Sequence, residues 1–251
     1  RVIVDRADPF IRDCVREGVP FLSVVWFHTP HTPVVAGPHY REIYSQFSED
    51  EQHYYGCVTA MDEQVGRLND LVKELDLEDN TAIWFCSDNG PEGSEDLTRN
   101  GRDRGSTGGL RGRKRSLFNG GVGVPALVKW PKYVNPGAEY TTACSTLDYF
   151  PTLAEELGYS MPDDRPLDGL SLLPLLRNQM EERPSPIPYR FLEGKSAMFG
   201  SPTLAMMGNR YKYLTNLSED GAEDMMFDVL DDPFETTNLI HKQKETAEQM
   251  R

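Results

Sequence analysis

An aspartate and an asparagine, Asp88 and Asn89, directly follow an apolar run at residues 81–86. Their carboxylate and carboxamide oxygens are hard ligands that suit Ca²⁺ or Mg²⁺ better than a thiophilic metal. Gly90 and Pro91 shape a sharp turn behind them. Calcium takes about six to eight oxygens, so other residues would have to complete such a site. An ordinary Asx turn at the end of a strand is the alternative explanation.

Two histidines, His28 and His31, lie in a polar loop after a second apolar run, and Pro30 and Pro33 stiffen that loop. An imidazole held in place can donate to an anionic oxygen or protonate a leaving group. His31, which lies between the two prolines, has the stronger case. The alternative for both is a surface or core histidine without a chemical role.

A cluster of cations interrupts an otherwise acidic chain. Residues 99–115 hold seven lysines and arginines against one acidic residue, Asp103, whereas the whole chain has a formal net charge of −14. Lys114 and its neighbours therefore predict an electropositive wall for an anionic substrate such as a sulfate or phosphate ester. A solvated basic loop is the alternative. Nucleic acid is disfavoured as a partner, because no aromatic platform interleaves with the cations and the sequence pI is about 4.8.

The elements expected to position these residues alternate between strands and helices. Apolar runs predict strands at residues 21–27, 81–86 and 124–130, the first two buried in a parallel or mixed sheet. Helices are predicted at residues 5–18, 49–75 and 148–157. The second helix begins with a capping box, from Ser48 to Glu51. This alternation favours an α/β fold, with a layered mixed β-sheet flanked by helices and a ligand crevice beyond the carboxyl ends of the strands.

Composition bounds the class of protein. With 251 residues, 38% of them hydrophobic and 26% charged, the chain is expected to be soluble and globular. No apolar run approaches the ~20 residues of a membrane span, and four widely spaced cysteines exclude a zinc ribbon. Past a proline-rich linker, short strand candidates at residues 189–193, 203–207, 211–214 and 226–229 predict a small antiparallel sheet. We therefore expect domains at residues 1–182 and 183–251.

Taken together and in this order, these segments resemble the back portion of a type I sulfatase, within the alkaline-phosphatase-like superfamily. The resemblance is carried first by FLSVVWFHTPHTP, IWFCSDNGPEG and GLRGRKRSLFNGGVGVPALVKWP, the last with Asn119 where an acidic residue is common. It continues through LDYFPTLAEELG, LDGLSLLPLL, RYKYL and MFDVLDDPFETTNL. Each segment is weak alone, but their shared order and spacing are specific.

The resemblance implies a role for each matching residue. Asp88 and Asn89 match ligands of the family's single Ca²⁺ ion. Lys114 matches the lysine that binds the sulfate and supports the departing ester oxygen, and His31 matches the histidine that contacts the sulfate and is a candidate proton donor. Because loops carry specificity, the candidates for substrate contacts are His28, His39, Tyr40, Arg104 and Arg111.

The sequence also departs from the family pattern. A type I sulfatase needs formylglycine, formed from Cys or Ser in C/S-x-P-x-R, and no cysteine or serine of this chain has that context. We expect the chain to be a piece of a longer protein, with formylglycine and further calcium ligands in a missing front section. The chain alone should be inactive. The resemblance implies that the parent protein is secreted, periplasmic or lysosomal.

Three functions follow as hypotheses. The first is a sulfuric ester hydrolase acting on a sulfate ester, such as a sulfated carbohydrate. The second is a phosphomonoester or phosphonate hydrolase of the same superfamily, although its two-zinc members carry Asp-His-Gly where this chain has Asp88-Asn89-Gly90. The third is a non-catalytic module that keeps the fold and an anion pocket.

Overall fold

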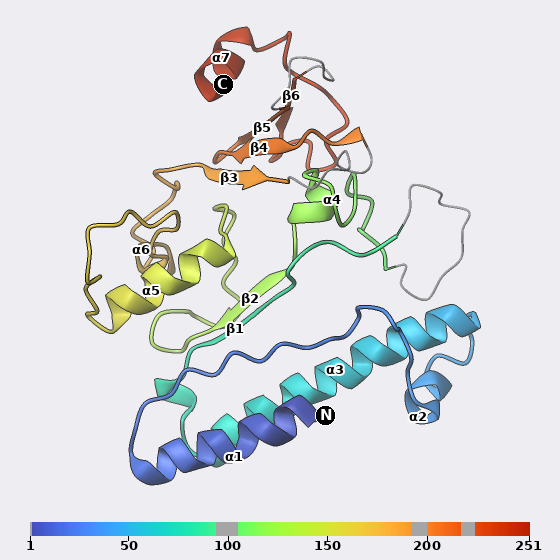
Figure 1. The fold of residues 1–251 in the computed structure, drawn as a ribbon, viewed down its shortest axis with the longest axis vertical. Coiled ribbons are helices and arrows are strands. Elements are labelled where there is room, and N and C mark those ends of the chain that lie inside the picture. The colour runs from blue at the N-terminus through green and yellow to red at the C-terminus, as the bar shows by residue number, and fades with distance from the viewer. Residues whose placement is uncertain (1, 94–104, 192–199, 217–223) are drawn as a thin grey trace. The chain divides into compact units, whose positions relative to one another are not determined.

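The computed structural model describes residues 2–93, 105–191, 200–216 and 224–251 (Figure 1). The chain forms two compact units, the first made of residues 1–82 and 91–106 and the second of residues 83–90 and 107–251. No helix among the described residues is both long enough and apolar enough to cross a membrane. The expected domain boundary at 182/183 falls inside the second unit and stays a prediction.

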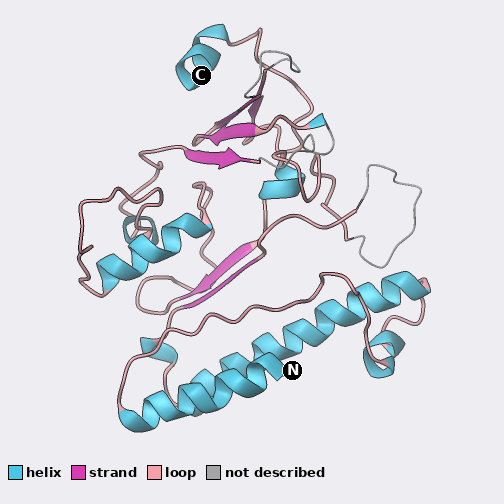
Figure 2. Ribbon diagram, viewed as in Figure 1, coloured by secondary structure: helices cyan, strands magenta, loops and turns pink. Residues whose placement is uncertain are grey.

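Two helices, α1 (Val2–Glu17) and α3 (Glu49–Glu74), lie side by side in the first unit (Figures 1 and 2). They run in the same direction, because Asp5 pairs with Arg67 and, seven residues further along each helix, Arg12 pairs with Glu74. The predicted capping box of α3 is confirmed. Ser48 Oγ accepts the Glu51 N–H, and the Glu51 carboxylate accepts the Ser48 N–H at 3.1 Å.

The strand predicted at residues 21–27 is not formed, and this prediction is wrong. The segment is extended but makes no ladder with any described residue. Its side chains alternate as in a strand: Leu22, Val24 and Trp26 are 70%, 67% and 82% exposed, while their neighbours are half-buried. A period of two sets the direction of side chains, but a strand also needs a hydrogen-bonded neighbour.

A short helix, α2 (Pro38–Glu42), packs against α3 in the first unit. A small core beneath it contains Val34, Ala36 and Cys57. Gly56 permits this close approach, since a Cβ there would lie 2.8 Å from the Ala36 Cβ. This contact holds the segment that follows the His28–His31 loop against α3.

In the second unit, β1 (Ile83–Cys86) pairs antiparallel with β2 (Ala126–Lys129), with Ile83 opposite Lys129 and Cys86 opposite Ala126. A 3₁₀ helix, Glu78–Asn80, precedes β1 in the chain. Both strands lie within the runs predicted at residues 81–86 and 124–130. The α/β class is therefore confirmed, and the strands of the described residues pair in antiparallel fashion.

The predicted C-terminal sheet is confirmed as an antiparallel meander. Its strands are β3 (Ile187–Arg190), β4 (Leu204–Met207), β5 (Tyr211–Thr215) and β6 (Met225–Asp228). One face packs on Leu117 and Phe118, which precede the short helix α4 (Asn119–Val122). The other face is covered by α7 (Lys244–Met250). The sheet is thus joined directly to the loop that carries Lys114.

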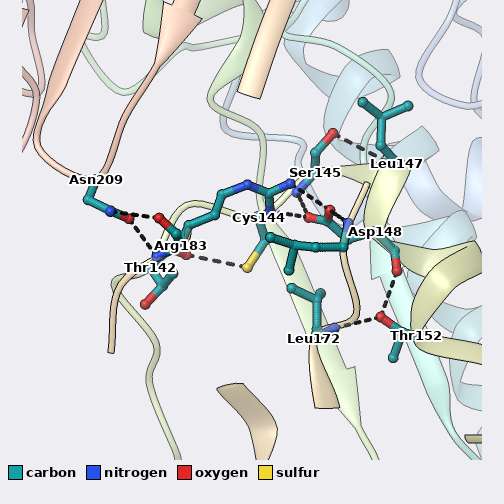
Figure 3. A network of polar contacts seen from close by, with 10 residues as sticks. Thr142, Cys144, Ser145, Leu147, Asp148, Thr152, Leu172, Arg183 and Asn209 are labelled. Atoms are coloured by element: carbon teal, nitrogen blue, oxygen red, sulfur yellow. Dashed lines mark hydrogen bonds and ion pairs between the residues drawn. The ribbon is translucent and has the colours of Figure 1, made fainter. Parts of the chain in front are cut away.

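A buried ion pair ties the start of α5 (Tyr149–Glu156) to the segment before β3 (Figure 3). Arg183 donates two hydrogen bonds of 2.8 Å to Asp148, which ends the 3₁₀ helix Thr146–Asp148. The Asp148 carboxylate also accepts the backbone N–H groups of Ser145 and Leu170. These hydrogen bonds offset much of the cost of burying both charges, although Arg183 Nε is buried without a hydrogen-bond partner. The remaining helix, α6 (Leu173–Leu176), packs on α5.

Candidate functional site

Asp88 and Asn89 form a tight turn immediately after β1. The Asn89 N–H donates to Asp88 Oδ1 at 3.0 Å, and Ser87 Oγ donates to the Asn89 carbonyl at 2.9 Å. The Asn89 side-chain amide donates to the Gly90 carbonyl at 2.9 Å. The Gly90 N–H donates to the Gly121 carbonyl and not to Asp88, so the turn is not the Asx turn of the alternative explanation. It presents polar atoms outward, because Asp88 is exposed.

The turn offers hard oxygens in a fixed orientation. Because the Asn89 NH₂ group is used on the Gly90 carbonyl, its Oδ1 is left available as an acceptor. The Asn89 Oδ1 and the Asp88 carboxylate fit a Ca²⁺ ion chemically. Among the described residues no group of three or more carboxylate, histidine or cysteine side chains completes the site, so further ligands must come from elsewhere.

Gly90 seats this turn on the start of α4. Its N–H donates to the Gly121 carbonyl at 2.8 Å. A Cβ at residue 90 would lie 1.8 Å from the Gly120 carbonyl oxygen, so no residue with a side chain fits there without a shift of the backbone. We call Gly120 and Gly121 the diglycine junction.

The loop that carries Lys114 is seated on the same junction. The Gly120 N–H donates to the Arg111 carbonyl at 2.7 Å, and a Cβ on Gly121 would lie 2.0 Å from the Ser116 carbonyl oxygen. Gly120 and Gly121 bring one backbone segment against another.

Lys114 itself lies at the second position of a tight turn. The Ser116 N–H donates to the Arg113 carbonyl at 3.0 Å, which makes Lys114 and Arg115 the two central residues. Arg115 has a φ of 71°, the left-handed conformation that a type II turn needs at its third position. Lys114 is half-buried, at the corner of the turn.

The other basic candidates differ in their surroundings. The Arg111 guanidinium stacks on the Phe118 ring, 3.9 Å from its centroid, and donates to the Glu235 carbonyl at 3.1 Å. Arg111 thus has structural contacts, and its predicted substrate contact stays a prediction. Arg104, with the rest of residues 94–104, lies outside the described residues.

His28 and His31, in the first unit, point both rings at one carbonyl. His28 Nε2 lies 3.1 Å and His31 Nδ1 3.0 Å from the Thr32 carbonyl oxygen. Since a carbonyl only accepts, each of these ring nitrogens carries its proton. In the neutral imidazole of His31, Nε2 is then the unprotonated atom. Both residues are exposed, so His31 can present Nε2 to a ligand.

The remaining first-unit candidates, His39 and Tyr40, lie on α2. The Tyr40 hydroxyl donates to the Glu63 carboxylate, and the exposed His39 ring packs edge-on to the Tyr40 ring. Sequence reasoning missed a further histidine, His53, which is buried. Its Nδ1 accepts the Ala36 N–H at 3.1 Å and so anchors the chain beyond the His31 loop. No short sequence pattern marks that contact, because it joins residues 17 apart.

Sequence reasoning also missed a buried charged group beside the diglycine junction. Lys212 on β5 and Glu235 after β6 are both fully buried and meet Asn119. The sequence held one signal of this burial. Lys212 and Leu214 are two residues apart on β5, so their side chains point to the same face of the sheet, and Leu214 is buried there.

Comparison with known proteins assigns the family. The family model described as Sulfatase matches residues 1–159, and the model described as N-sulphoglucosamine sulphohydrolase, C-terminal, matches residues 112–251. The chain belongs to the sulfatase family. The Asp88-Asn89 turn lies within the first match, and the Lys114 loop and diglycine junction lie within both.

Individual sulfatases show how much of such a protein this chain spans. It is 36% identical to mouse (Mus musculus) steryl-sulfatase over 184 residues, which cover 72% of the chain but 28% of that protein. It is 31% identical to human (Homo sapiens) N-acetylgalactosamine-6-sulfatase over 186 residues, which cover 73% of the chain and 34% of that protein. The chain therefore spans about a third of these relatives.

Solved structures support the fold over nearly the whole chain. The crystal structure of Ps i-CgsB superposes with a TM-score of 0.82 at 27% identity, covering 99% of this chain and 52% of that one. The PsFucS1 sulfatase from Pseudoalteromonas sp. superposes with a TM-score of 0.78 at 21% identity, covering 99% of this chain and 50% of that one. The predicted alkaline-phosphatase-like fold is confirmed.

Proposed function

We propose that the whole protein to which this chain belongs is a sulfuric ester hydrolase. The observation that carries the proposal is the seating of the Asp88-Asn89 turn and the Lys114 turn on one diglycine junction. Hard oxygen ligands and a cation are thereby held to one rigid support, an arrangement that suits the hydrolysis of an anionic ester. Membership of the sulfatase family supports the same reaction.

Asp88 and Asn89 would hold one Ca²⁺ ion together with ligands outside the described residues. Bound there, the ion would offset negative charge on the sulfate and orient the nucleophile. Asp88 brings a formal charge, and Asn89 brings a neutral oxygen whose direction its own hydrogen bond sets. The nucleophile in this proposal is a formylglycine in C/S-x-P-x-R, a context that none of the 251 residues provides.

Lys114 would bind the sulfate and stabilise the ester oxygen as it leaves. Negative charge moves onto that oxygen as the S–O bond breaks, and a cation held nearby lowers the energy of this transition state. The tight turn around Lys114 fixes its backbone, so little reorganisation is needed during the reaction.

His31 would contact the sulfate and deliver a proton to the leaving oxygen from Nε2. The Thr32 carbonyl keeps a proton on Nδ1, so protonation of the ring takes place at Nε2. A proton at that atom can then move to the alkoxide, which makes His31 a general acid. His28, His39, Tyr40 and the two arginines Arg104 and Arg111 are proposed contacts for the leaving group.

The proposed substrates are sulfate esters, with sulfated carbohydrates or steroids as candidates because relatives are named steryl-sulfatase and N-acetylgalactosamine-6-sulfatase. The proposed location of the whole protein is secreted, periplasmic or lysosomal.

The test uses the full-length protein and two matched substrates, 4-methylumbelliferyl sulfate and 4-methylumbelliferyl phosphate. We expect hydrolysis of the sulfate, one bound Ca²⁺ per chain by metal analysis, and loss of activity with a calcium chelator. Preferred hydrolysis of the phosphate, with two bound zinc ions, would replace the proposal with the phosphatase hypothesis. Binding of both anions without turnover would identify a non-catalytic module.

A further inference from the structure

Lys212 is a charged side chain without exposure to solvent. The exposed fraction of its side chain is 0%, as is that of Glu235, whose Oε1 lies 2.8 Å from Lys212 Nζ. Lysine is almost never fully buried unless it is paired. Burial lowers the pKa of Lys212, while the Glu235 carboxylate opposes this shift. The pair therefore occupies a position where a hydrophobic pair of similar volume would be less costly.

Asn119 is the residue on which this pair converges. Lys212 Nζ donates to Asn119 Oδ1 at 2.9 Å, and the Asn119 backbone N–H donates to Glu235 Oε2 at 2.6 Å. The side-chain NH₂ of Asn119 donates to the Pro233 carbonyl at 2.9 Å. The backbone N–H, the side-chain oxygen and the side-chain nitrogen of Asn119 are thus all held by β5 and by the segment that follows β6.

Glu235 also holds Arg111, the residue whose backbone carbonyl binds Gly120 of the diglycine junction. Arg111 donates to the Glu235 carbonyl, and the carbonyl of Arg111 accepts the Gly120 N–H. Glu235 has a φ of 56°, a conformation that a non-glycine residue adopts only when its surroundings impose it. Asn119 directly precedes Gly120, so Glu235 restrains the junction through two separate residues.

We propose that Lys212 and Glu235 are positioning residues, which act through Asn119 and the diglycine junction to set the Asp88-Asn89 turn and the Lys114 turn. This inference rests on the proposed function, because it concerns the same calcium and sulfate groups. It gives the C-terminal sheet a part in the reaction, although none of the proposed site residues lies on its strands. A buried pair that contributes only stability is the competing explanation.

The deciding comparison is between two variants of the full-length protein. Lys212→Met/Glu235→Leu removes both charges and leaves the Asn119 N–H without its acceptor. Lys212→Met/Glu235→Gln also removes both charges but keeps a side-chain oxygen for that N–H. We expect the leucine variant to bind Ca²⁺ at least tenfold more weakly by calorimetry, and to lose at least tenfold in kcat for 4-methylumbelliferyl sulfate with a smaller change in KM. Lys212→Met/Glu235→Gln should keep most of the Ca²⁺ affinity and most of the kcat of the wild type.

A matched control separates positioning from stability. The Arg183–Asp148 pair is also buried in the second unit but makes no hydrogen bond to the junction (Figure 3). Arg183→Met/Asp148→Asn should lower the melting temperature and leave Ca²⁺ affinity unchanged. Amide hydrogen exchange at residues 88–90 and 111–121 should accelerate in the Lys212→Met/Glu235→Leu variant and not in this control.

The inference is overturned if Lys212→Met/Glu235→Leu folds and keeps Ca²⁺ affinity and kcat within twofold of the wild type. It is also overturned if the glutamine variant and the leucine variant lose Ca²⁺ affinity and kcat to the same extent. Should the leucine variant fail to fold, Asn119→Ala decides instead: unchanged Ca²⁺ affinity rejects the inference, and a threefold or greater loss supports it. A wild-type protein without Ca²⁺-dependent sulfate hydrolysis rejects the proposed function itself, whatever these variants do.

Discussion

At the scale of single residues, the proposed site depends on which side-chain atoms are left to bind a ligand once their neighbours in the same side chain have formed hydrogen bonds. Asn89 keeps Oδ1 because its NH₂ group is bound, and His31 keeps Nε2 because its Nδ1–H is bound. The position of the Lys114 backbone is set by the turn that the Arg113–Ser116 hydrogen bond closes. These hydrogen bonds are all made to nearby backbone, so residue types and short spacing were enough to propose the three residues as candidates.

Replacement of Lys114 by alanine should lower kcat of the full-length protein at least 100-fold. Loss of one group that stabilises developing negative charge costs about 2.7–4 kcal/mol in the transition state. Steady-state hydrolysis of 4-methylumbelliferyl sulfate measures the effect. Lys242→Ala, an exposed lysine of the same unit, serves as the control and should leave kcat unchanged. A kcat within threefold of the wild type for Lys114→Ala would remove the assigned role.

Cys144 should react slowly with alkylating reagents in the folded protein. Cys144 is an exposed residue whose Sγ donates to the Thr142 carbonyl. Desolvation of the thiol, and then the nearby Asp148 carboxylate, raise its pKa from 9.0 to about 11. Because the folded pKa is the higher one, the resulting stabilisation is complete below pH 9 and is lost as the pH rises toward 11.

Iodoacetamide labelling at pH 8, followed by mass spectrometry, tests this pKa. A shift of two pH units leaves about 100-fold less thiolate, so labelling of Cys144 should be slower than in urea-unfolded protein by a similar factor. Equal rates in the folded and unfolded protein would show that the thiol is not sheltered.

At the scale of elements, close approach between segments decides which substitutions are tolerated. Gly56 and Gly66 lie on the same helix, α3, but in opposite surroundings. A Cβ on Gly56 would lie 2.8 Å from the Ala36 Cβ, whereas a Cβ on Gly66 would meet nothing within 4 Å. The two glycines therefore provide a matched pair of substitutions.

Gly66→Ala should raise the free energy of unfolding by about 0.5–1 kcal/mol, because alanine loses less backbone entropy than glycine in a helix. Gly56→Ala should lower it by about 1–3 kcal/mol, since the added methyl group overpacks the core around Ala36. Urea denaturation of both variants measures the difference. A stabilising Gly56→Ala would contradict the packing of α2 against α3.

At the scale of the whole molecule, the described residues hold part of the proposed site and an exposed apolar row. Asp88 and Asn89 supply two oxygens, and Leu22, Val24 and Trp26 form an exposed apolar row on a segment without a strand partner. The chain spans 52% of the chain in the crystal structure of Ps i-CgsB. We expect the remainder of the full-length protein to supply both the missing ligands and the missing strands.

The 251-residue chain by itself should bind Ca²⁺ no more tightly than roughly millimolar, the weak end of the range for protein sites. It should not hydrolyse an aryl sulfate, and its exposed apolar row should favour aggregation. Calorimetry and light scattering on the chain alone and on the full-length protein measure these differences. Micromolar Ca²⁺ affinity of the chain alone would contradict this prediction.

Sequence patterns alone determined the features that depend on neighbouring residues. The capping box at Ser48, the turn at Asp88-Asn89 and the strands of the C-terminal meander follow from local hydrogen bonding and from periodicity. Tertiary structure decided the rest. Residues 21–27 have a strand's alternation but no neighbour to pair with, and Lys212 and Glu235 reach Asn119 from about a hundred residues away. The reason is physical: a ladder bond or a buried ion pair forms only when folding brings distant segments together, and no local pattern encodes its partner.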